Sequence, residues 1–359
     1  MPRLGPRSRA LLALLAFALP ARLGAGCVTP GRLRPRALEL EAAGVQALAH
    51  GELESAAGNF ALALEYEPRL AEARNGLGIV ALRRGDVTRA EEDFRAALAL
   101  DEELVEAHLN LAEVLMRRGA NDRALAEARA SLAIDPGYAD ARLLAGELLL
   151  RLGHPSEAHW ELEKLCAEAP RRADAHAANA LVLVRLGRPA AAEEQAELAL
   201  ALDPELPAAH RARAELLRNA GDLGAALQQI DLVVAANPGS IDDRLLRATI
   251  LAAQRRWGEA TRALAELAAA APAQPEVRFA MAFVALGRGQ PTAAVADADA
   301  ALALRPRYPE ARLVRAQALL RLGRRADARR ELLRFLDDAP ATMAAERAQA
   351  KQTLDGVPR

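Results

Sequence analysis

The chain has 359 residues, with 47 basic and 48 acidic side chains and a formal net charge of −1 at pH 7. This balance leaves no surplus of positive charge that would attract nucleic acid as a main partner. Aromatic residues make up only 3% of the chain, which argues against an ordinary globular core and favours closely packed helices.

The amino terminus has the features of an export signal. Three arginines, Arg3, Arg7 and Arg9, precede an apolar run at residues 10–21. A run of this length is too short to span a bilayer comfortably but is typical of a signal-peptide core. We therefore predict a signal peptide over residues 1–26.

A cysteine, Cys27, follows this run. Residues 23–27 read Leu-Gly-Ala-Gly-Cys and resemble the lipobox of bacterial lipoproteins, which implies cleavage before the cysteine and a lipid on its thiol. Gly24 stands where leucine is usual, and Arg22 adds a charge, so ordinary signal-peptidase cleavage and an uncleaved anchor remain alternatives. The lipobox reading makes residues 27–36 a lipidated linker.

Prolines recur along the chain at spacings of 34 or 68 residues, and Glu102 occupies the one missing place. They are Pro68, Pro136, Pro170, Pro204, Pro238, Pro272, Pro306 and Pro340. A fixed period of this length is the signature of a repeat architecture. The period divides the chain without insertion into nine units, at 37–70, 71–104, 105–138, 139–172, 173–206, 207–240, 241–274, 275–308 and 309–342.

Small residues and glycines occupy fixed places in each unit. The eighth place is always glycine or alanine, from Gly44 to Ala316, and the twentieth is always alanine, from Ala56 to Ala328, so two helices can approach closely there. The fifteenth place is glycine except at Arg255, which predicts a left-handed turn after the first helix. Prolines two places later in three units, at Pro155, Pro189 and Pro291, predict the start of the second helix.

This pattern of small residues, glycine turn and closing proline resembles the tetratricopeptide repeat (TPR) family. The resemblance implies an all-α fold, a right-handed α-solenoid of nine helix-turn-helix units over residues 37–342. Residues 343–359 are expected to form a capping helix and tail, with Thr342 as its N-cap. The fourth place departs from the family because arginine or histidine replaces the usual bulky aromatic, which predicts looser or differently shaped packing there.

No catalytic or cofactor chemistry is apparent in the sequence. It has no nucleophile elbow, no phosphate-binding glycine loop and no HExxH motif, so we expect no enzyme, cofactor or small-molecule substrate. His108, His176 and His210 share the fourth place of different units, but the spacing of stacked helices favours a structural role over a metal site. Cys166 is expected in the core, because a bond to Cys27 would consume the thiol that the lipobox presents.

The resemblance implies a groove, formed by the first helices, that receives a peptide or a partner helix. Four arginines recur there at 34-residue intervals and would form a ladder up units 2 to 5: Arg83, Arg117, Arg151 and Arg185. Glu113 and Glu147 lie four residues before two of them, so intrahelical ion pairs are the competing interpretation.

A second candidate is apolar. Phe279 and Phe283 lie four residues apart on the first helix of unit 8, with Leu286, Leu313 and Leu320 nearby. An apolar cluster on a concave face often marks a binding site. Core packing between units 8 and 9 is the alternative.

These features predict a protein-interaction scaffold without enzymatic activity. The lipobox favours a lipoprotein of the cell envelope, and Val28 after the cysteine favours, by analogy, the outer membrane facing the periplasm. Such a protein resembles the repeat lipoproteins that assemble pilus, secretion or gliding-motility machines. The alternative is a soluble periplasmic chaperone or adaptor that has the same groove and no lipid.

Overall fold

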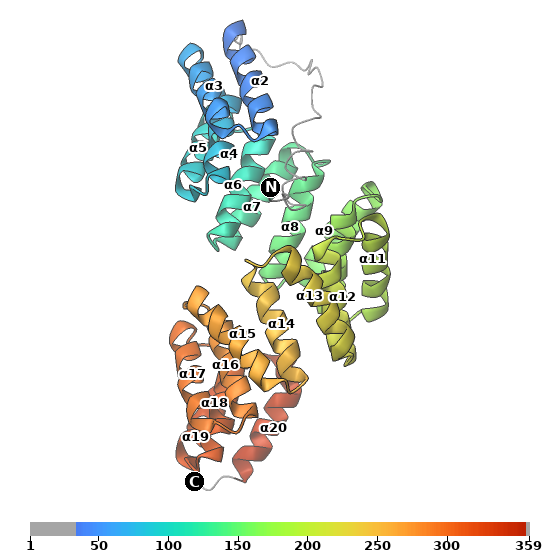
Figure 1. Ribbon diagram of the computed structural model, residues 1–359, viewed down its shortest axis with the longest axis vertical. Coiled ribbons are helices and arrows are strands. Elements are labelled where there is room, and N and C mark those ends of the chain that lie inside the picture. Colours follow the sequence, from blue (N-terminus) through green and yellow to red (C-terminus); the bar gives the residue numbers. More distant parts are fainter. Residues whose placement is uncertain (1–33, 357–359) are drawn as a thin grey trace. The chain divides into compact units, whose positions relative to one another are not determined.

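The computed structural model describes residues 34–356, so the predicted signal peptide, Cys27 and most of the linker lie outside the described residues. The described elements are α-helices and one 3-10 helix, with no strand among residues 34–356. The predicted all-α array of helix pairs is confirmed (Figure 1).

Each predicted 34-residue repeat contains two helices joined by a short turn. The pairs are α2 (Pro35–His50) and α3 (Leu53–Tyr66), α4 (Ala71–Arg83) and α5 (Val87–Leu100), α6 (Val105–Arg117) and α7 (Asn121–Ile134), α8 (Ala139–Arg151) and α9 (Pro155–Glu168), α10 (Ala173–Arg185) and α11 (Pro189–Leu202), α12 (Pro207–Ala220) and α13 (Leu223–Ala236), α14 (Ile241–Ala253) and α15 (Trp257–Ala270), α16 (Pro275–Gly287) and α17 (Pro291–Leu304), and α18 (Pro309–Arg321) and α19 (Arg325–Asp338). The three prolines expected to start second helices begin α9, α11 and α17.

The chain divides into two larger compact units, each made of several of these repeats, one ending at Ala212 and the other beginning at Arg213. In both units, the first helices of successive repeats contact one another directly. Helix α2 contacts α4 in the first unit, and α16 contacts α18 in the second. The second helices make no comparable contact in the described part of either unit. Each unit therefore curves toward its first helices, and their exposed side is the inner face.

Every alanine at the twentieth place is completely buried, as the repeat period predicts. The eighth place faces a residue sixteen positions later on the second helix. A Cβ added to Gly44 would lie 2.6 Å from the ring of Phe60, and one on Gly78 would lie 2.5 Å from Phe94. Glycine is required there because the opposing ring fills the space of a methyl group.

The left-handed turn is present in all nine pairs. The eight predicted glycines have φ between 68° and 86°, and Arg255 takes the same conformation with φ 60°. Left-handed backbone is unfavourable for a residue with a Cβ, such as Arg255. The packing of the two helices of repeat 7 therefore maintains the turn against this local cost.

The fourth place is packed differently, and not loosely, which agrees with one of the two expectations from the missing aromatic. In six repeats its arginine or histidine pairs with a polar residue nineteen positions later on the second helix. His108 thus bonds Glu127 at 2.7 Å, and Arg142 bonds Glu161 at 3.0 Å, whereas Arg244 bonds Glu266, twenty-two positions later. In five repeats it also bonds a carbonyl six residues earlier, in the loop from the preceding repeat. A polar strut thus replaces the aromatic and ties two helices to the loop.

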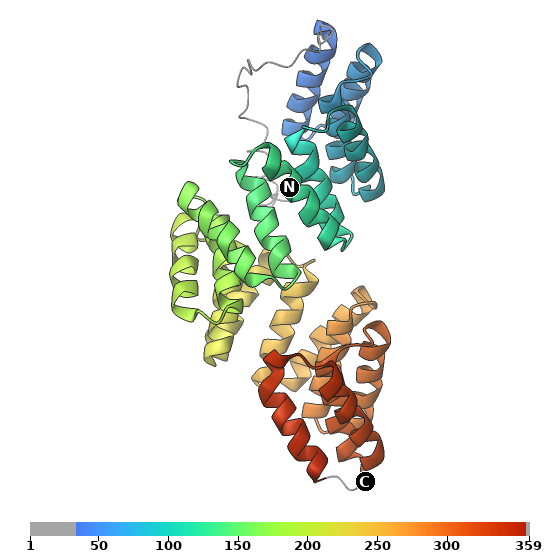
Figure 2. The same cartoon turned by 180° about the vertical axis from the view of Figure 1, so that it is seen from behind.

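The carboxyl end carries the predicted cap, with one correction. A 3-10 turn (Ala341–Met343) precedes α20 (Ala344–Asp355), whose N-cap position is held by Met343, so Thr342 does not cap the helix. Ala350 of α20 packs in one cluster with Leu332 and Phe335 of the last repeat. Figure 2 shows α20, the red helix at the carboxyl end, beside this repeat. Arg347 donates to two carbonyl oxygens at the end of α19, those of Leu336 and Ala339, both at 2.6 Å.

Cys166 lies half-buried on α9 against the core of the first unit, as expected. Burial, together with nearby acids, raises the pKa of its thiol to about 11. A thiol that stays protonated at neutral pH is a poor nucleophile, so this cysteine has a packing role.

Candidate partner-binding face

The inner face of the first unit carries charges of both signs at opposite ends of its helices. Acids stand in the first turn of α4, α6, α8 and α10, and arginines stand in the last turn of the same helices. Each sign sits where the helix dipole stabilises it. The regular recurrence of the arginines therefore has a structural cause before any ligand is considered.

The four predicted ladder arginines differ in their surroundings. Arg83 is half-buried and donates from Nη1 to the carbonyl oxygen of Leu48 at 2.5 Å, which ties repeat 2 to repeat 1. Arg117, Arg151 and Arg185 are exposed. Arg321 of repeat 9, which the sequence analysis missed, makes the same contact as Arg83, to Leu286 O at 2.6 Å. The sequence contained a signal for this contact, because Arg321 occupies the thirteenth place of repeat 9, as Arg83 does in repeat 2.

Acidic side chains lie close to the ladder arginines of repeats 3 and 4. Burial raises the pKa of Glu113, with Asp140 and Glu147 adding repulsion and Arg117 opposing them. Burial and the charge of Glu72 likewise raise the pKa of Glu41. Acids thus accompany the arginines on this surface, and a binding role for the ladder stays a prediction.

The second unit presents the apolar part of its inner face on α16. Phe283 is 47% exposed, whereas Phe279 is partly buried and its ring centroid lies 5.3 Å from that of Tyr308. Leu286 is 5% exposed and belongs to the core, so its predicted place in the groove is wrong. Leu313 and Leu320 are partly buried, with Leu313 packed on the core around Phe335.

The two phenylalanines thus have different roles: Phe279 packs in the core, and Phe283 exposes its ring. Phe279 packs against Ala282 and Ala311 in the core, while Phe283, one turn later, offers its ring to solvent. Burying an exposed aromatic ring is among the strongest contributions that a single residue makes to a protein interface. Phe283 is the part of the predicted apolar cluster best placed to contact a partner.

Among residues 34–356, no group of three or more His, Cys, Asp and Glu side chains is arranged to hold a metal ion. His176 instead bonds Gln195 at 2.7 Å and the carbonyl of Pro170 at 3.1 Å, as a strut of repeat 5. No helix within the described range is long and apolar enough to cross a membrane.

Comparison with protein-family models places repeats over most of the array. Residues 42–104, 81–139, 177–241 and 279–342 match one tetratricopeptide repeat model, and residues 116–182 match a second. Together these segments cover more than half of the chain. The search of curated proteins found no match to the sequence.

Solved structures show the same fold. A tetratricopeptide repeat protein from Parabacteroides merdae is 16% identical, with a TM-score of 0.53 over 69% of this chain and 98% of that one. A chain of the APC/C hetero-tetramer Cut9–Hcn1 is 14% identical, with a TM-score of 0.62 over 78% of this chain and 55% of that one. PilW, a type IV pilus biogenesis factor, is 26% identical over 58% of this chain and 97% of that one, but its TM-score of 0.47 is too low to support a functional argument.

Proposed function

Because the chain belongs to the tetratricopeptide repeat family, whose members bind protein or peptide partners, we propose that it is a non-enzymatic scaffold that captures a protein on the inner face of repeats 8 and 9. The observation that supports this most directly is the exposure of Phe283, at 47%, on the inner side of α16. The chain contains only six phenylalanines, and Phe60, Phe94 and Phe335 are completely buried.

The chemistry of this surface favours a partner with an apolar stripe. Phe283 provides one exposed ring, and the partly buried Leu313 and Leu320 on α18 continue the apolar surface. An amphipathic helix can bury its own apolar residues on such a surface, in the way that helices dock into hydrophobic grooves. The partner class is therefore a protein segment that exposes such a helix.

The proposed location follows from the amino-terminal sequence. Cys27 after an apolar run and a lipobox-like segment supports a lipid anchor in the cell envelope, with Val28 favouring the outer membrane. A diacylated cysteine would hold the repeats at the periplasmic surface, because two chains anchor a protein stably where one does not. There the scaffold would assemble or tether an envelope machine of the pilus, secretion or gliding-motility type.

A soluble periplasmic adaptor is the second candidate, and it is favoured by one observation. Gly24 stands where a lipobox usually has leucine, and Arg22 places a charge close to the cleavage site. Both candidates use the same inner face and differ only in the anchor. Fractionation of the Cys27→Ser variant separates them.

The experiment that tests the proposed function is capture of envelope proteins by purified full-length protein and by Phe283→Ala. Trp160→Ala is the matched control, since Trp160 is also an exposed aromatic residue, at 60%, but lies on the second helix α9. We expect Phe283→Ala to lose a specific partner that wild type and Trp160→Ala both retain. Equal capture by all three proteins would overturn the assignment of this face.

A further inference from the structure

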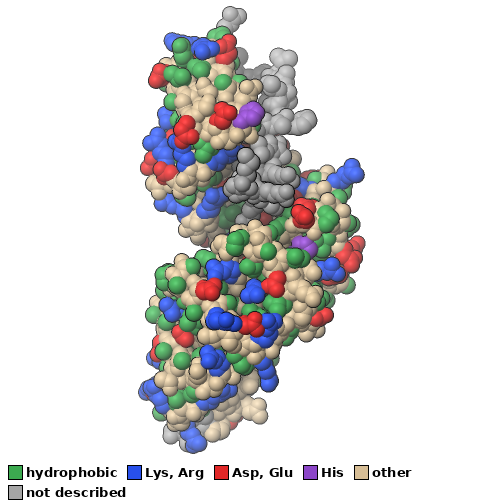
Figure 3. Space-filling model, in the orientation of Figure 1, with side chains coloured by type: hydrophobic (Ala, Val, Ile, Leu, Met, Phe, Trp, Pro, Cys, Tyr) green, Lys and Arg blue, Asp and Glu red, His purple; other side chains and the backbone are tan. Residues whose placement is uncertain are grey.

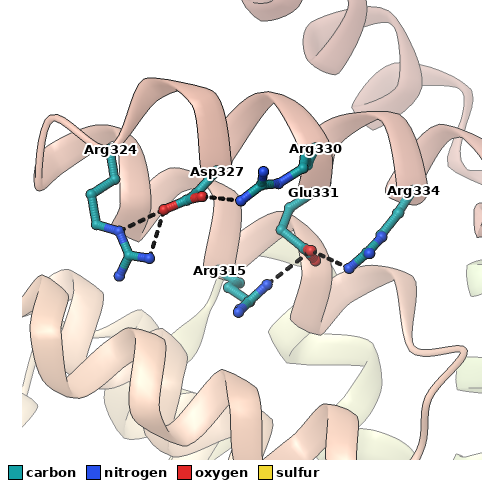
Figure 4. Close-up of a pocket in the computed structure, with 6 residues that line it drawn as sticks. All are labelled: Arg315, Arg324, Asp327, Arg330, Glu331 and Arg334. Carbon is teal, nitrogen blue, oxygen red and sulfur yellow. Dashed lines mark hydrogen bonds and ion pairs between the residues drawn. The ribbon is translucent and has the colours of Figure 1, made fainter.

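Repeat 9 contains a surface cavity of about 400 Å³ whose lining includes none of the partner-face residues Phe283, Leu313 and Leu320. Four arginines and two acids line it: Arg315, Arg324, Asp327, Arg330, Glu331 and Arg334 (Figure 4). They come from α18, from the turn before α19 and from α19 itself. The lining therefore has two more positive than negative charges.

The two acids hold the arginines in place. The side chain of Glu331 is only 3% exposed, and its Oε1 pairs with Arg315 at 2.8 Å and with Arg334 at 2.9 Å. Asp327 pairs with Arg324 at 2.6 Å and also with Arg330. Arg312, outside the lining, also pairs with Glu331 at 3.3 Å, and Asp299 pairs with Arg315 at 2.5 Å. These ion pairs fix the positions of the guanidinium groups before any ligand arrives.

Most donors of these arginines are not used inside the protein. A guanidinium carries five N–H donors, and Arg330 and Arg334 each engage their acid through a single terminal nitrogen. Their side chains are 69% and 62% exposed. Hydrogen bonding to Arg324, with the charges of Arg324, Arg330 and Arg315, lowers the pKa of Asp327, which is consistent with a positive field in the cavity.

The surrounding sequence strengthens this field. Repeats 1 to 5, residues 37–206, contain 31 acidic and 17 basic side chains, whereas repeats 6 to 9, residues 207–342, contain 15 acidic and 20 basic. Repeat 9 alone has 8 arginines against 5 acids. Figure 3 shows Lys and Arg side chains scattered over the part of the surface that the last repeats form.

We propose that the arginine cavity of repeat 9 is a binding site for a phosphate-monoester group. A dianion of this kind matches the charge surplus of the lining, and its three terminal oxygens can accept from several fixed guanidinium forks at once. A single carboxylate carries one charge and two oxygens, and therefore satisfies the cavity less well. The cavity opens to solvent, so the esterified part of the ligand can leave it.

Repeat 7 provides a natural comparison in the same register. Arg247, Arg256 and Arg262 surround Glu259 there, as Arg315, Arg324 and Arg330 surround Asp327, and Arg256 pairs with Glu259 at 2.7 Å. The place of Arg334 is taken by Glu266, and the place of Glu331 by Ala263. The cluster in repeat 7 thus lacks the fourth arginine and has a smaller charge surplus, so we expect it not to bind.

The test is titration of the full chain with inorganic phosphate and with O-phosphoserine at constant ionic strength, followed by calorimetry and phosphorus NMR. The variant is Arg330→Gln with Arg334→Gln, and the matched control is Arg256→Gln with Arg262→Gln. Both pairs remove two exposed arginines, and circular dichroism melts establish that each variant is folded. Glutamate and vesicles containing phosphatidic acid serve as competing probes.

We expect saturable binding of both phosphate probes to wild type, at least tenfold weaker binding to the repeat 9 variant, and a change of less than twofold in the repeat 7 control. Glutamate should bind at least tenfold more weakly than phosphoserine. Equal binding by wild type and the repeat 9 variant would overturn the proposal, as would binding of vesicles or glutamate without binding of phosphoserine.

Discussion

Arg142 donates from Nη1 to Oε2 of Glu161 across 3.0 Å, and the two side chains are only 4% and 14% exposed. Removing Glu161 leaves the buried Arg142 with a longer ion pair to Glu168, at 3.6 Å, and with the carbonyl oxygen of Pro136. We therefore predict that Glu161→Ala lowers the free energy of unfolding by about 2 kcal/mol, less than the loss for a buried charge that keeps no partner. Thermal and urea melts measure this loss.

The control for this prediction removes both charges. Repeat 1 naturally carries Leu40 at the place of Arg142, buried to 7% exposure. Arg142→Leu combined with Glu161→Leu should therefore recover most of the stability that Glu161→Ala loses. A double variant as unstable as the single one would show that the strut has no apolar substitute in repeat 4.

A second prediction concerns the contact of Gly78 with Phe94. A methyl group on Gly78 would lie 2.5 Å from a ring that is completely buried, so Gly78→Ala should cost about 1 to 3 kcal/mol through overpacking. Adding Phe94→Leu reproduces the Ala248 and Leu264 combination of repeat 7 and should offset much of the loss. Purely additive effects in a double-mutant cycle would contradict the proposed contact.

A third prediction follows from the raised pKa of Glu113. The folded state binds the proton of this carboxyl more tightly than the unfolded state does, because burial and the acids Asp140 and Glu147 disfavour its charge. Its contribution to stability is therefore fully present below the unfolded pKa and is lost as pH rises through the folded pKa. Glu113→Gln should raise the melting temperature at pH 7 and leave it nearly unchanged below about pH 4. A gain of equal size at both pH values would contradict this cause.

A fourth prediction concerns the anchor. Cys27→Ser should release the protein from the membrane fraction and abolish palmitate labelling, because serine offers no thiol for the diacylglycerol. The Cys166→Ser variant, which changes the half-buried cysteine, should keep both properties. Retention of Cys27→Ser in the membrane fraction would show that another segment anchors the protein.

Much of the fold could be predicted from sequence because stacking depends on small residues at fixed places. The left-handed turns follow directly from the glycine period. The turn at Arg255 could not be predicted, since only packing by the rest of the unit forces an arginine to φ 60°. The strut at the fourth place was missed for a related reason, because its partner lies on the second helix, nineteen residues away.

The candidate site was predicted less well because spacing along one helix does not determine depth. Phe279, Phe283 and Leu286 fall on one side of α16, yet Phe279 packs on Tyr308 and Leu286 is buried in the core. Only Phe283 is exposed. Similarly, Arg83 belongs to the same sequence ladder as Arg117 but is engaged by the carbonyl of Leu48. These differences depend on the neighbouring repeats.

The most direct test of the proposed scaffold function is site-specific photocrosslinking in living cells, with a photoreactive amino acid at position 283 or at position 160. Both positions are exposed, but position 283 lies on the inner side of α16 and position 160 lies on the second helix α9. Binding on the inner face of repeats 8 and 9 predicts a discrete protein adduct from position 283 and no matching adduct from position 160. No adduct at position 283, or the same adducts from both positions, would contradict it.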